Sequence, residues 1–105
     1  MGASGSKDEL LQFLFDHGNR SEIVNEMDLT PMNDGGMGSH LFTSTKKHRV
    51  LGSVVCECEF LDSDGTLVSA TLSSDQDGDL FELDVWKVDF SELKQWPPRN
   101  QISIC

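Results

Sequence analysis

The sequence predicts an α+β fold, in which an N-terminal amphipathic helix packs on an antiparallel meander sheet of four or five strands. Residues 7–17 have the apolar spacing of a helix, whereas most later segments alternate between apolar and polar residues. Short turns with an Asp-Gly pair separate the later segments, which favours antiparallel pairing of neighbouring strands. With 105 residues, we expect a flexible leader over residues 1–6 and a single domain over residues 7–105.

The helix is expected over Lys7–His17. Ser6 and Glu9 have the spacing of a capping box, in which the serine side chain accepts the backbone N–H three residues on. Gly18 is well placed to end the helix. The apolar face consists of Leu10, Leu11, Phe13, Leu14 and Phe15.

Five segments after the helix are expected to form strands, and tight turns connect them. The strands are predicted at residues 23–29, 40–44, 50–61, 66–73 and 79–90. Pro31 ends the first strand or places it at a sheet edge. Residues 91–96 are expected to form a short helical turn before two prolines.

The last predicted strand changes phase along its length. Phe81, Leu83 and Val85 alternate on one face, and then apolar residues continue on the opposite parity from Trp86. A β-bulge near Val85–Trp86 would bring the two sets together. Alternatively, both faces of the strand are buried, as in the central strand of an oligomer, and Lys87 lies on the face opposite Trp86.

The charge distribution limits the classes of partner that the protein is expected to bind. The net charge is −10, and the one basic cluster is Lys46, Lys47 and Arg49. Binding to nucleic acid or to an anionic membrane surface is therefore not expected, because phosphates would be repelled. A basic protein partner would be attracted. A solvated acidic surface is the ordinary interpretation of the same pattern.

The cysteines and the aspartate-rich turns predict neither a disulfide nor a metal site. Cys56 and Cys58 are two residues apart, which is poor disulfide geometry, so a reducing cytoplasm fits best. Asp75, Asp77 and Asp79 match the first positions of a calcium loop, but the glycine and glutamate that follow in such loops are absent. Hairpin turns explain them, and we expect no cofactor and no catalytic set.

Two groups of residues are candidates for ligand or partner binding. The first is the glycine-rich loop with Asp34, Gly36 and Ser39, whose backbone amides could form an anion-binding nest. A turn that needs positive φ is the alternative interpretation. The second group comprises Glu82, Asp84 and Trp86. The two carboxylates share the parity of the aromatic residue and could bind a polar or cationic ligand with it.

Two motifs resemble those of an uncharacterised family of small stand-alone bacterial proteins. They are the segments at residues 34–39 (DGGMGS) and 78–90 (GDLFELDVWKVDF), and the resemblance extends over about residues 23–96. Small proteins carried on mobile gene cassettes are also similar. The resemblance implies a bacterial cytoplasmic protein with one compact domain, and it implies no activity, cofactor or catalytic residue.

The sequence favours a non-enzymatic protein-interaction module that self-associates. Apolar residues on both parities of the last strand predict a homo-oligomer, since a single helix cannot cover both faces of a sheet. An acidic protein that binds a basic partner is a version of this hypothesis. The alternative is a small-ligand-binding domain or a modest enzyme with a pocket around Glu82, Asp84 and Trp86.

Overall fold

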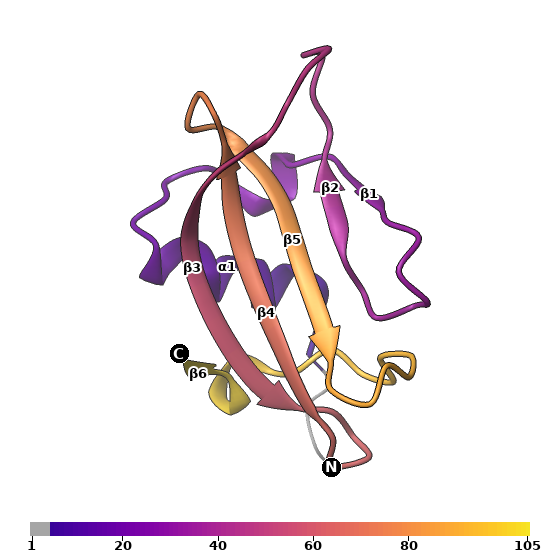
Figure 1. Cartoon of the computed structure of the whole chain (residues 1–105). Helices are drawn as coiled ribbons and strands as arrows, with labels where there is room; N and C mark the ends of the chain where they lie inside the picture. Colours follow the sequence, from indigo (N-terminus) through magenta and orange to yellow (C-terminus); the bar gives the residue numbers. More distant parts are fainter. Residues whose placement is uncertain (1–4) are drawn as a thin grey trace.

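The computed structural model describes residues 5–105 and forms one α-helix and a six-stranded antiparallel sheet. Residues 1–4 of the expected leader lie outside the described residues. The helix is α1 (Lys7–His17), and the strands are β1 (Leu29–Pro31), β2 (His40–Phe42), β3 (Leu51–Leu61), β4 (Leu67–Asp75), β5 (Leu80–Lys87) and β6 (Ser103–Ile104). Two short 3₁₀ helices cover Val24–Glu26 and Arg99–Gln101. The α+β class and the N-terminal helix are thus confirmed (Figure 1).

Helix α1 begins and ends close to where the sequence predicts. The Ser6 hydroxyl oxygen accepts the backbone N–H of Glu9 at 3.1 Å, which satisfies one of the free amides of the first turn. At the other end the Gly18 N–H donates to the Leu14 carbonyl at 2.9 Å. The left-handed residue that turns the chain is Asn19, with φ of 57°, and Gly18 has φ of −92°.

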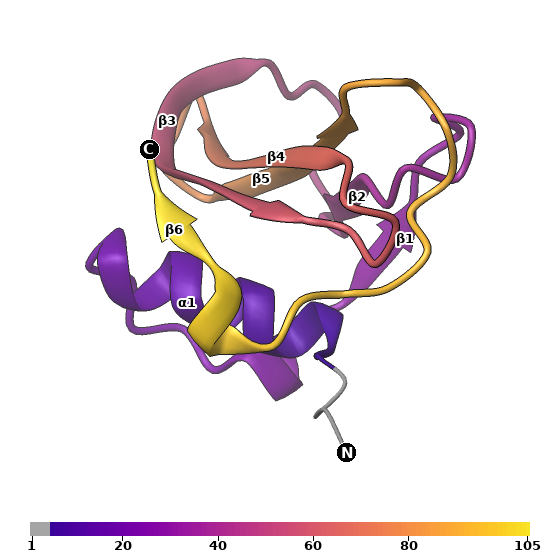
Figure 2. The ribbon, with the colours of Figure 1, turned by 90° about the horizontal axis from the view of Figure 1, so that it is seen from below.

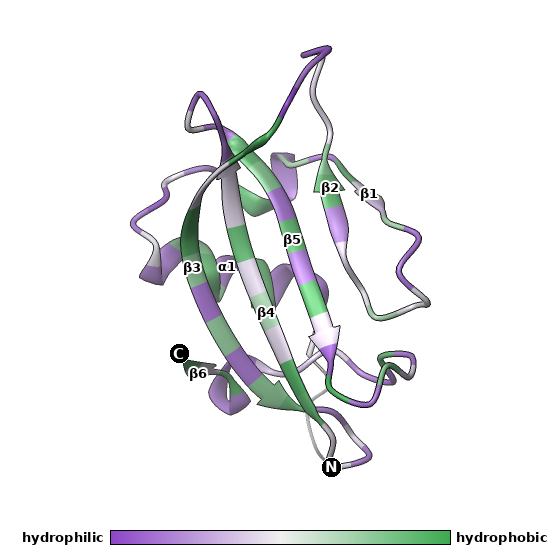
Figure 3. Ribbon diagram, in the orientation of Figure 1, coloured by the Kyte–Doolittle hydropathy of each residue, from purple (hydrophilic) through white to green (hydrophobic). Residues whose placement is uncertain are grey.

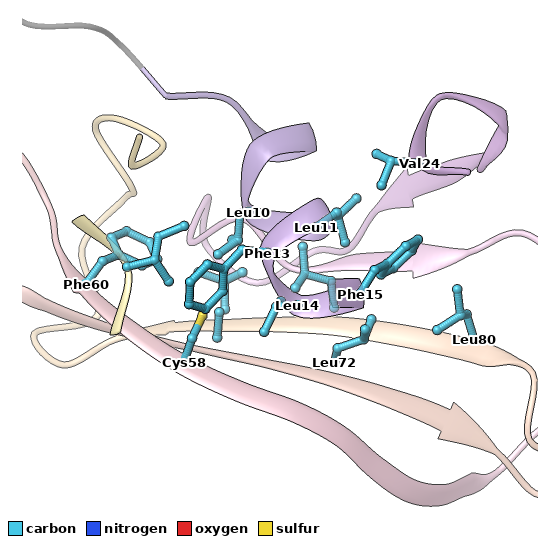
Figure 4. Packing of buried hydrophobic residues seen from close by; sticks show 14 of the residues in the cluster. Leu10, Leu11, Phe13, Leu14, Phe15, Val24, Cys58, Phe60, Leu72 and Leu80 are labelled. Atoms are coloured by element: carbon cyan, nitrogen blue, oxygen red, sulfur yellow. The ribbon is translucent and has the colours of Figure 1, made fainter. Parts of the chain in front are cut away.

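Helix α1 covers one face of the sheet, and within residues 5–105 no helix lies over the opposite face (Figures 1 and 2). The apolar face of α1 packs on inward side chains of β3, β4 and β5 (Figure 4). The fully buried members of this core include Leu10, Leu14, Cys58, Leu72 and Leu83. The sheet therefore has one face buried under the helix and one face that the helix does not cover, which we call the open face. At one end of the open face Ser73 and Asp75 are nevertheless buried.

The strand order differs from the predicted meander of four or five strands. The sheet has six strands in the order β1-β2-β5-β4-β3-β6, so only β3, β4 and β5 form a meander. The β1–β2 hairpin pairs with β5, and residues 43–50 cross one end of the sheet to reach β3 (Figure 1). Arg49 holds this crossing segment, because its guanidinium donates to the carbonyls of Phe42 and Leu80 at 2.8 and 2.6 Å.

Two predicted elements are wrong. Residues 23–29 form a 3₁₀ helix followed by the start of β1, because Val24 is the buried residue there and Ile23 is exposed. Residues 91–96 form no helix. The amides of Lys94 and Gln95 donate instead to the Asp62 carboxylate, which removes them from any helical turn. Pro31 does lie in an edge strand, as one of its two interpretations predicted.

The bulge in the last strand lies at its start, and the predicted position at Val85–Trp86 is wrong. Pairing of β4 with β5 is regular from Val68↔Lys87 to Ser73↔Glu82 and then shifts by one residue, at Phe81. Leu80, Leu83 and Val85 consequently face the core, and Lys87 follows them inward. Strand β5 ends at Lys87, so Val88 and Phe90 lie beyond it.

Candidate functional site: the open sheet face

The open face consists of cross-strand rows that the strand register defines. One row joins Leu61 and Leu67, and the next joins Glu59, Ser69 and Trp86. A third row joins Glu57, Thr71 and Asp84, and a fourth joins Leu41, Glu82 and Ser73. Hydropathy alternates along β4 and β5 accordingly (Figure 3). The face is thus apolar at one end and acidic along its middle.

Five large apolar side chains gather at one end of the open face, and we call them the aromatic patch. They are Leu61, Leu67, Trp86, Val88 and Phe90. The Val88 N–H donates to the Leu67 carbonyl at 3.1 Å, which extends the first row beyond β5. The rings of Trp86 and Phe90 meet edge to face with centroids 6.0 Å apart. Trp86 is 49% exposed and Phe90 is 69% exposed, so the monomer leaves both rings in solvent.

Phe90 keeps its exposed position at a conformational cost. Its φ is 64°, in the left-handed region that glycine adopts freely and that costs other residues about 1–2 kcal/mol. Residues held in such conformations cluster at functional sites. A phenylalanine here gains little from burial, because most of its ring stays in water. The geometry therefore favours a role for the ring outside the fold of the monomer.

Four acidic residues occupy the rows beside the aromatic patch, and none of the four rows contains a lysine or arginine. Glu57 and Glu59 stand on β3, and Glu82 and Asp84 stand on β5. The central strand β4 places the small hydroxyl side chains of Ser69, Thr71 and Ser73 between β3 and β5, and we call this strip the lane. Thr71 has a carboxylate on each side, whereas Ser69 and Ser73 have one on a single side. Burial raises the pKa of Glu82, and the nearby charge of Asp84 raises it further. We call these four residues the acidic rows.

The glycine-rich loop binds the chain's own carboxylate. The Asp34 carboxylate accepts the backbone N–H groups of Met37 and Ser39 at 3.2 and 2.8 Å. Burial alone would raise the pKa of Asp34, but these amides lower it below its ordinary value. The predicted anion nest is therefore filled from within. Gly36 has φ of 80°, and its carbonyl accepts the N–H of Leu93 at 3.1 Å.

Ser39 joins this loop to β5. It is buried, and its hydroxyl accepts the N–H of Val85 at 2.8 Å and lies 3.2 Å from the Val85 carbonyl, to which it donates. The six predicted site residues thus separate into two groups. Asp34, Gly36 and Ser39 shape the loop beside β5, whereas Glu82, Asp84 and Trp86 stand on the open face.

The aspartate-rich turn at residues 75–79, which matches the start of a calcium loop, pairs with a cationic side chain of the same chain. The Lys46 ammonium lies 2.8, 3.1 and 2.7 Å from the carboxylates of Asp75, Asp77 and Asp79. Arg49 adds a second contact to Asp75 at 2.9 Å. The Lys46 ammonium lowers the pKa of the Asp75 carboxyl well below its usual range, although burial opposes this. Lys46 thus occupies the place that a bound cation would take in such a turn.

Sequence reasoning missed a buried ion-pair cluster at the other end of the sheet. The Lys87 ammonium is fully buried and lies 2.8 Å from both Asp62 and Asp64. Burial alone would lower the pKa of Lys87, but the hydrogen bonds to the two aspartates outweigh burial and raise it. The signal in the sequence was the position of Lys87 on the inward parity of β5, two residues after Val85.

Three further features of the described residues bear on chemistry, namely a buried thiol, the side chains that could hold a metal ion, and a cleft. Burial raises the pKa of the Cys58 thiol to about 12, so the thiolate nucleophile is suppressed. Within residues 5–105 no group of three or more His, Cys, Asp or Glu side chains could hold a metal ion. A cleft of about 310 Å³ lies elsewhere, between Glu22, Glu26, Asp28 and Phe42 among others, and none of the six predicted site residues lines it. None of the described helices has the length and apolar content to cross a membrane.

Comparison with known proteins identifies a family. A family model described as a domain of unknown function, DUF6984, matches residues 4–97. The chain belongs to the DUF6984 family. No curated protein and no protein of solved structure matches this DUF6984 chain significantly. The expected membership of an uncharacterised family is confirmed, while the bacterial origin and the relation to mobile gene cassettes stay predictions.

Proposed function

We propose that this DUF6984 chain is a non-enzymatic protein-interaction module whose contact surface is the open sheet face. The observation that carries the proposal is the pair Trp86 and Phe90, two exposed aromatic rings in contact at one end of that face. Exposed aromatic residues grouped with aliphatic ones are typical of the centres of protein interfaces. The left-handed φ of Phe90 supports the same role.

The candidate binding and catalytic groups already have partners within the chain, which supports a non-enzymatic role. The loop amides at residues 37–39 bind Asp34, Lys46 pairs with the aspartate-rich turn, and Lys87 is buried between two aspartates. Within residues 5–105 every fully buried side-chain nitrogen and oxygen has a hydrogen-bond partner. Groups that are satisfied internally are costly to recruit for binding or catalysis.

Self-association is the second candidate, because two aromatic patches could bury each other. The acidic residues around the patch oppose this contact between two copies of the chain. The acidic rows lie on one side of the patch, and Asp89 lies next to Phe90 in the turn that follows β5. A second copy of the chain would therefore bring carboxylates toward carboxylates. A partner of a different kind avoids this repulsion.

Photo-crosslinking tests the proposed surface. A photoreactive phenylalanine analogue in place of Trp86 should give one discrete adduct with a second polypeptide in cells of the source organism, identified by mass spectrometry. The same analogue in place of exposed Asn25 is the matched control and should give no such adduct. Adducts shared by both positions, or none from position 86, would overturn the proposal. An adduct of two copies of the chain would assign the surface to self-association.

The substitution Phe90→Gly gives a variant that separates binding from folding. Glycine adopts φ of 64° without strain, and the ring it removes is mostly exposed, so the stability of the variant should stay within about 1 kcal/mol of the parent. The crosslink from position 86 should nevertheless disappear. An adduct that persists in this variant would exclude the aromatic patch from the interface.

A further inference from the structure

We infer that the partner of the open face is an extended polypeptide segment with lysine or arginine at alternate positions and an apolar residue at one end. This inference rests on the proposed function and names the partner's chemistry. It combines three features of the face: the aromatic patch at one end, the acidic rows beside it, and the lane of small hydroxyl side chains between those rows.

The spacing of the face fits an extended chain. Along β5 the residues Trp86, Asp84 and Glu82 follow one another on the same face, at about 7 Å per step. Leu61, Glu59 and Glu57 repeat the same order along β3. An extended segment that places an apolar side chain on the patch would therefore bring its third and fifth side chains over the carboxylates. Strand β4 separates the two borders, which leaves a lane about 10 Å wide for one chain.

The floor of the lane suits close approach. Ser69 and Thr71 are small, so a backbone could lie over β4 while longer side chains reach the borders on either side. Ser73 is buried and ends the accessible part of the lane. Ser69 and Thr71 are half-buried, and their hydroxyl groups are not engaged in a side-chain hydrogen bond among those of the described residues. They can serve as donors and acceptors for a partner.

The charges select a cationic occupant. Five of the eight lysine and arginine residues, namely Arg20, Lys46, Arg49, Lys87 and Arg99, already pair with the chain's own carboxylates. None of these five belongs to the four rows, so the four carboxylates there repel one another without a counter-charge from within the rows. Lys46 and Arg49 lie beyond the rows, where they pair with Asp75 at the end of β4. A lysine or arginine side chain between Glu57 and Asp84 would relieve that repulsion. Burial together with Asp84 keeps the pKa of Glu82 raised in the free protein.

Binding of a synthetic peptide tests the inference. The test peptide is a capped pentapeptide with phenylalanine first, lysine third and fifth, and serine between them. Titration into the full chain, followed by the NMR signals of the Trp86 indole and of the β4 and β5 amides, should give saturable shifts. Replacing both lysines with glutamate, or the phenylalanine with serine, should abolish or greatly weaken them.

A charge-matched pair of variants distinguishes the face from the overall acidity. The first variant carries Glu57→Gln, Glu59→Gln, Glu82→Gln and Asp84→Asn, and the control carries Asp8→Asn, Glu9→Gln, Glu26→Gln and Asp28→Asn, four exposed acids outside the open face. Both lose four negative charges. The first should bind the peptide about tenfold more weakly, and the control should bind almost as the parent does.

The outcomes separate this inference from the proposed function. Equal weakening in both variants, or spermine binding as tightly as the peptide, would show that only overall charge is recognised and would overturn the inference. Shifts that appear with protein concentration alone would assign the face to a second copy and would also overturn it. A discrete crosslink from position 86 without any peptide binding would leave the proposed function standing and reject the cationic partner.

Discussion

Single charged residues hold together segments that are far apart in the sequence, through ion pairs and hydrogen bonds. Asp75 is buried and receives Lys46 and Arg49, while its other carboxylate oxygen accepts the amides of Asp77 and Asp79. Arg49 also lies over the ring of Phe81, 4.8 Å from its centroid. One carboxylate thus ties the segment that crosses the sheet to the β4–β5 turn. Removing one partner of such a buried ion pair strongly destabilises the fold, because the other charge is left buried without a counter-charge.

The substitution Asp75→Asn should therefore lower the melting temperature by about 10 °C or more. The Arg49 guanidinium, only 9% exposed, would stay in place without its carboxylate. Thermal unfolding followed by circular dichroism measures the effect. Asp77→Asn is the control, since that carboxylate is 60% exposed and also contacts Lys46, and it should lower the melting temperature by about 2 °C at most. Equal losses in the two variants would contradict the assignment.

Ser39 has a structural role that a substitution can isolate. We expect Ser39→Ala to cost about 1–3 kcal/mol of stability, because the buried Val85 N–H loses the hydroxyl that accepts it. Urea unfolding measures this cost. Ser69→Ala on the open face should cost less, since Ser69 is only half-buried. A Ser39→Ala protein as stable as the parent would show that water replaces the hydroxyl.

At the scale of elements, the β3–β4 hairpin anchors the segment that follows β5. Asp62 lies at the start of the turn, and its carboxylate accepts the amides of Lys94 and Gln95 at 2.8 and 3.1 Å and the Lys87 ammonium. The Lys87 ammonium donates further to the Glu92 carbonyl at 3.1 Å. The extended course of residues 92–95 thus depends on a residue thirty positions earlier, which explains why the local sequence predicts a helical turn there instead.

Removing the Asp62 charge should loosen that segment. In Asp62→Asn the amides of Lys94 and Gln95 should exchange with deuterium faster than in the parent, because their acceptor weakens and the buried Lys87 loses a counter-charge. Hydrogen–deuterium exchange mass spectrometry of peptides from residues 88–105 measures this. The control Asp64→Asn removes the other contact of Lys87 but touches neither amide, so exchange at residues 94–95 should change less.

At the scale of the whole molecule, paired carboxylates make the fold sensitive to acid. The hydrogen bond from Lys87 lowers the pKa of Asp64 to about 2, and the pKa values of Asp62 and Asp75 are lowered as well. In the unfolded chain aspartates titrate near 3.9, so between these values the unfolded state binds more protons than the folded state. The stability from these pairs is therefore complete above about pH 4 and is lost as the pH falls toward 2.

Urea unfolding at a series of pH values tests this expectation. The free energy of unfolding should decline steadily from about pH 4 to pH 2. The decline should be shallower in Asp64→Asn, which has lost one of the titrating groups, although that variant starts from a lower stability. A parent protein whose stability does not change over this range would contradict the lowered pKa values.

Local signals in the sequence were sufficient for the elements whose structure depends on neighbours along the chain. The Ser6 cap, helix α1 and the two Asp-Gly turns of the β3–β4–β5 meander appear where they were predicted, because capping, helical periodicity and turn chemistry act within a few residues. The outward parity of Trp86, Asp84 and Glu82 also followed from alternation, although the bulge predicted near Trp86 lies at Phe81 instead.

Tertiary structure alone decided the features that join residues far apart in the chain. The placement of β2 beside β5, the two-residue strand β6 and the bulge at Phe81 depend on pairing between segments, which a linear pattern does not encode. The same holds for one candidate site, because the aspartate-rich turn pairs with Lys46, which lies 29 positions before Asp75. The amides of the glycine loop, in contrast, bind Asp34 from within the loop itself. Only the folded chain shows which charges pair with one another, and it shows that the four rows of the open face contain carboxylates but no lysine or arginine.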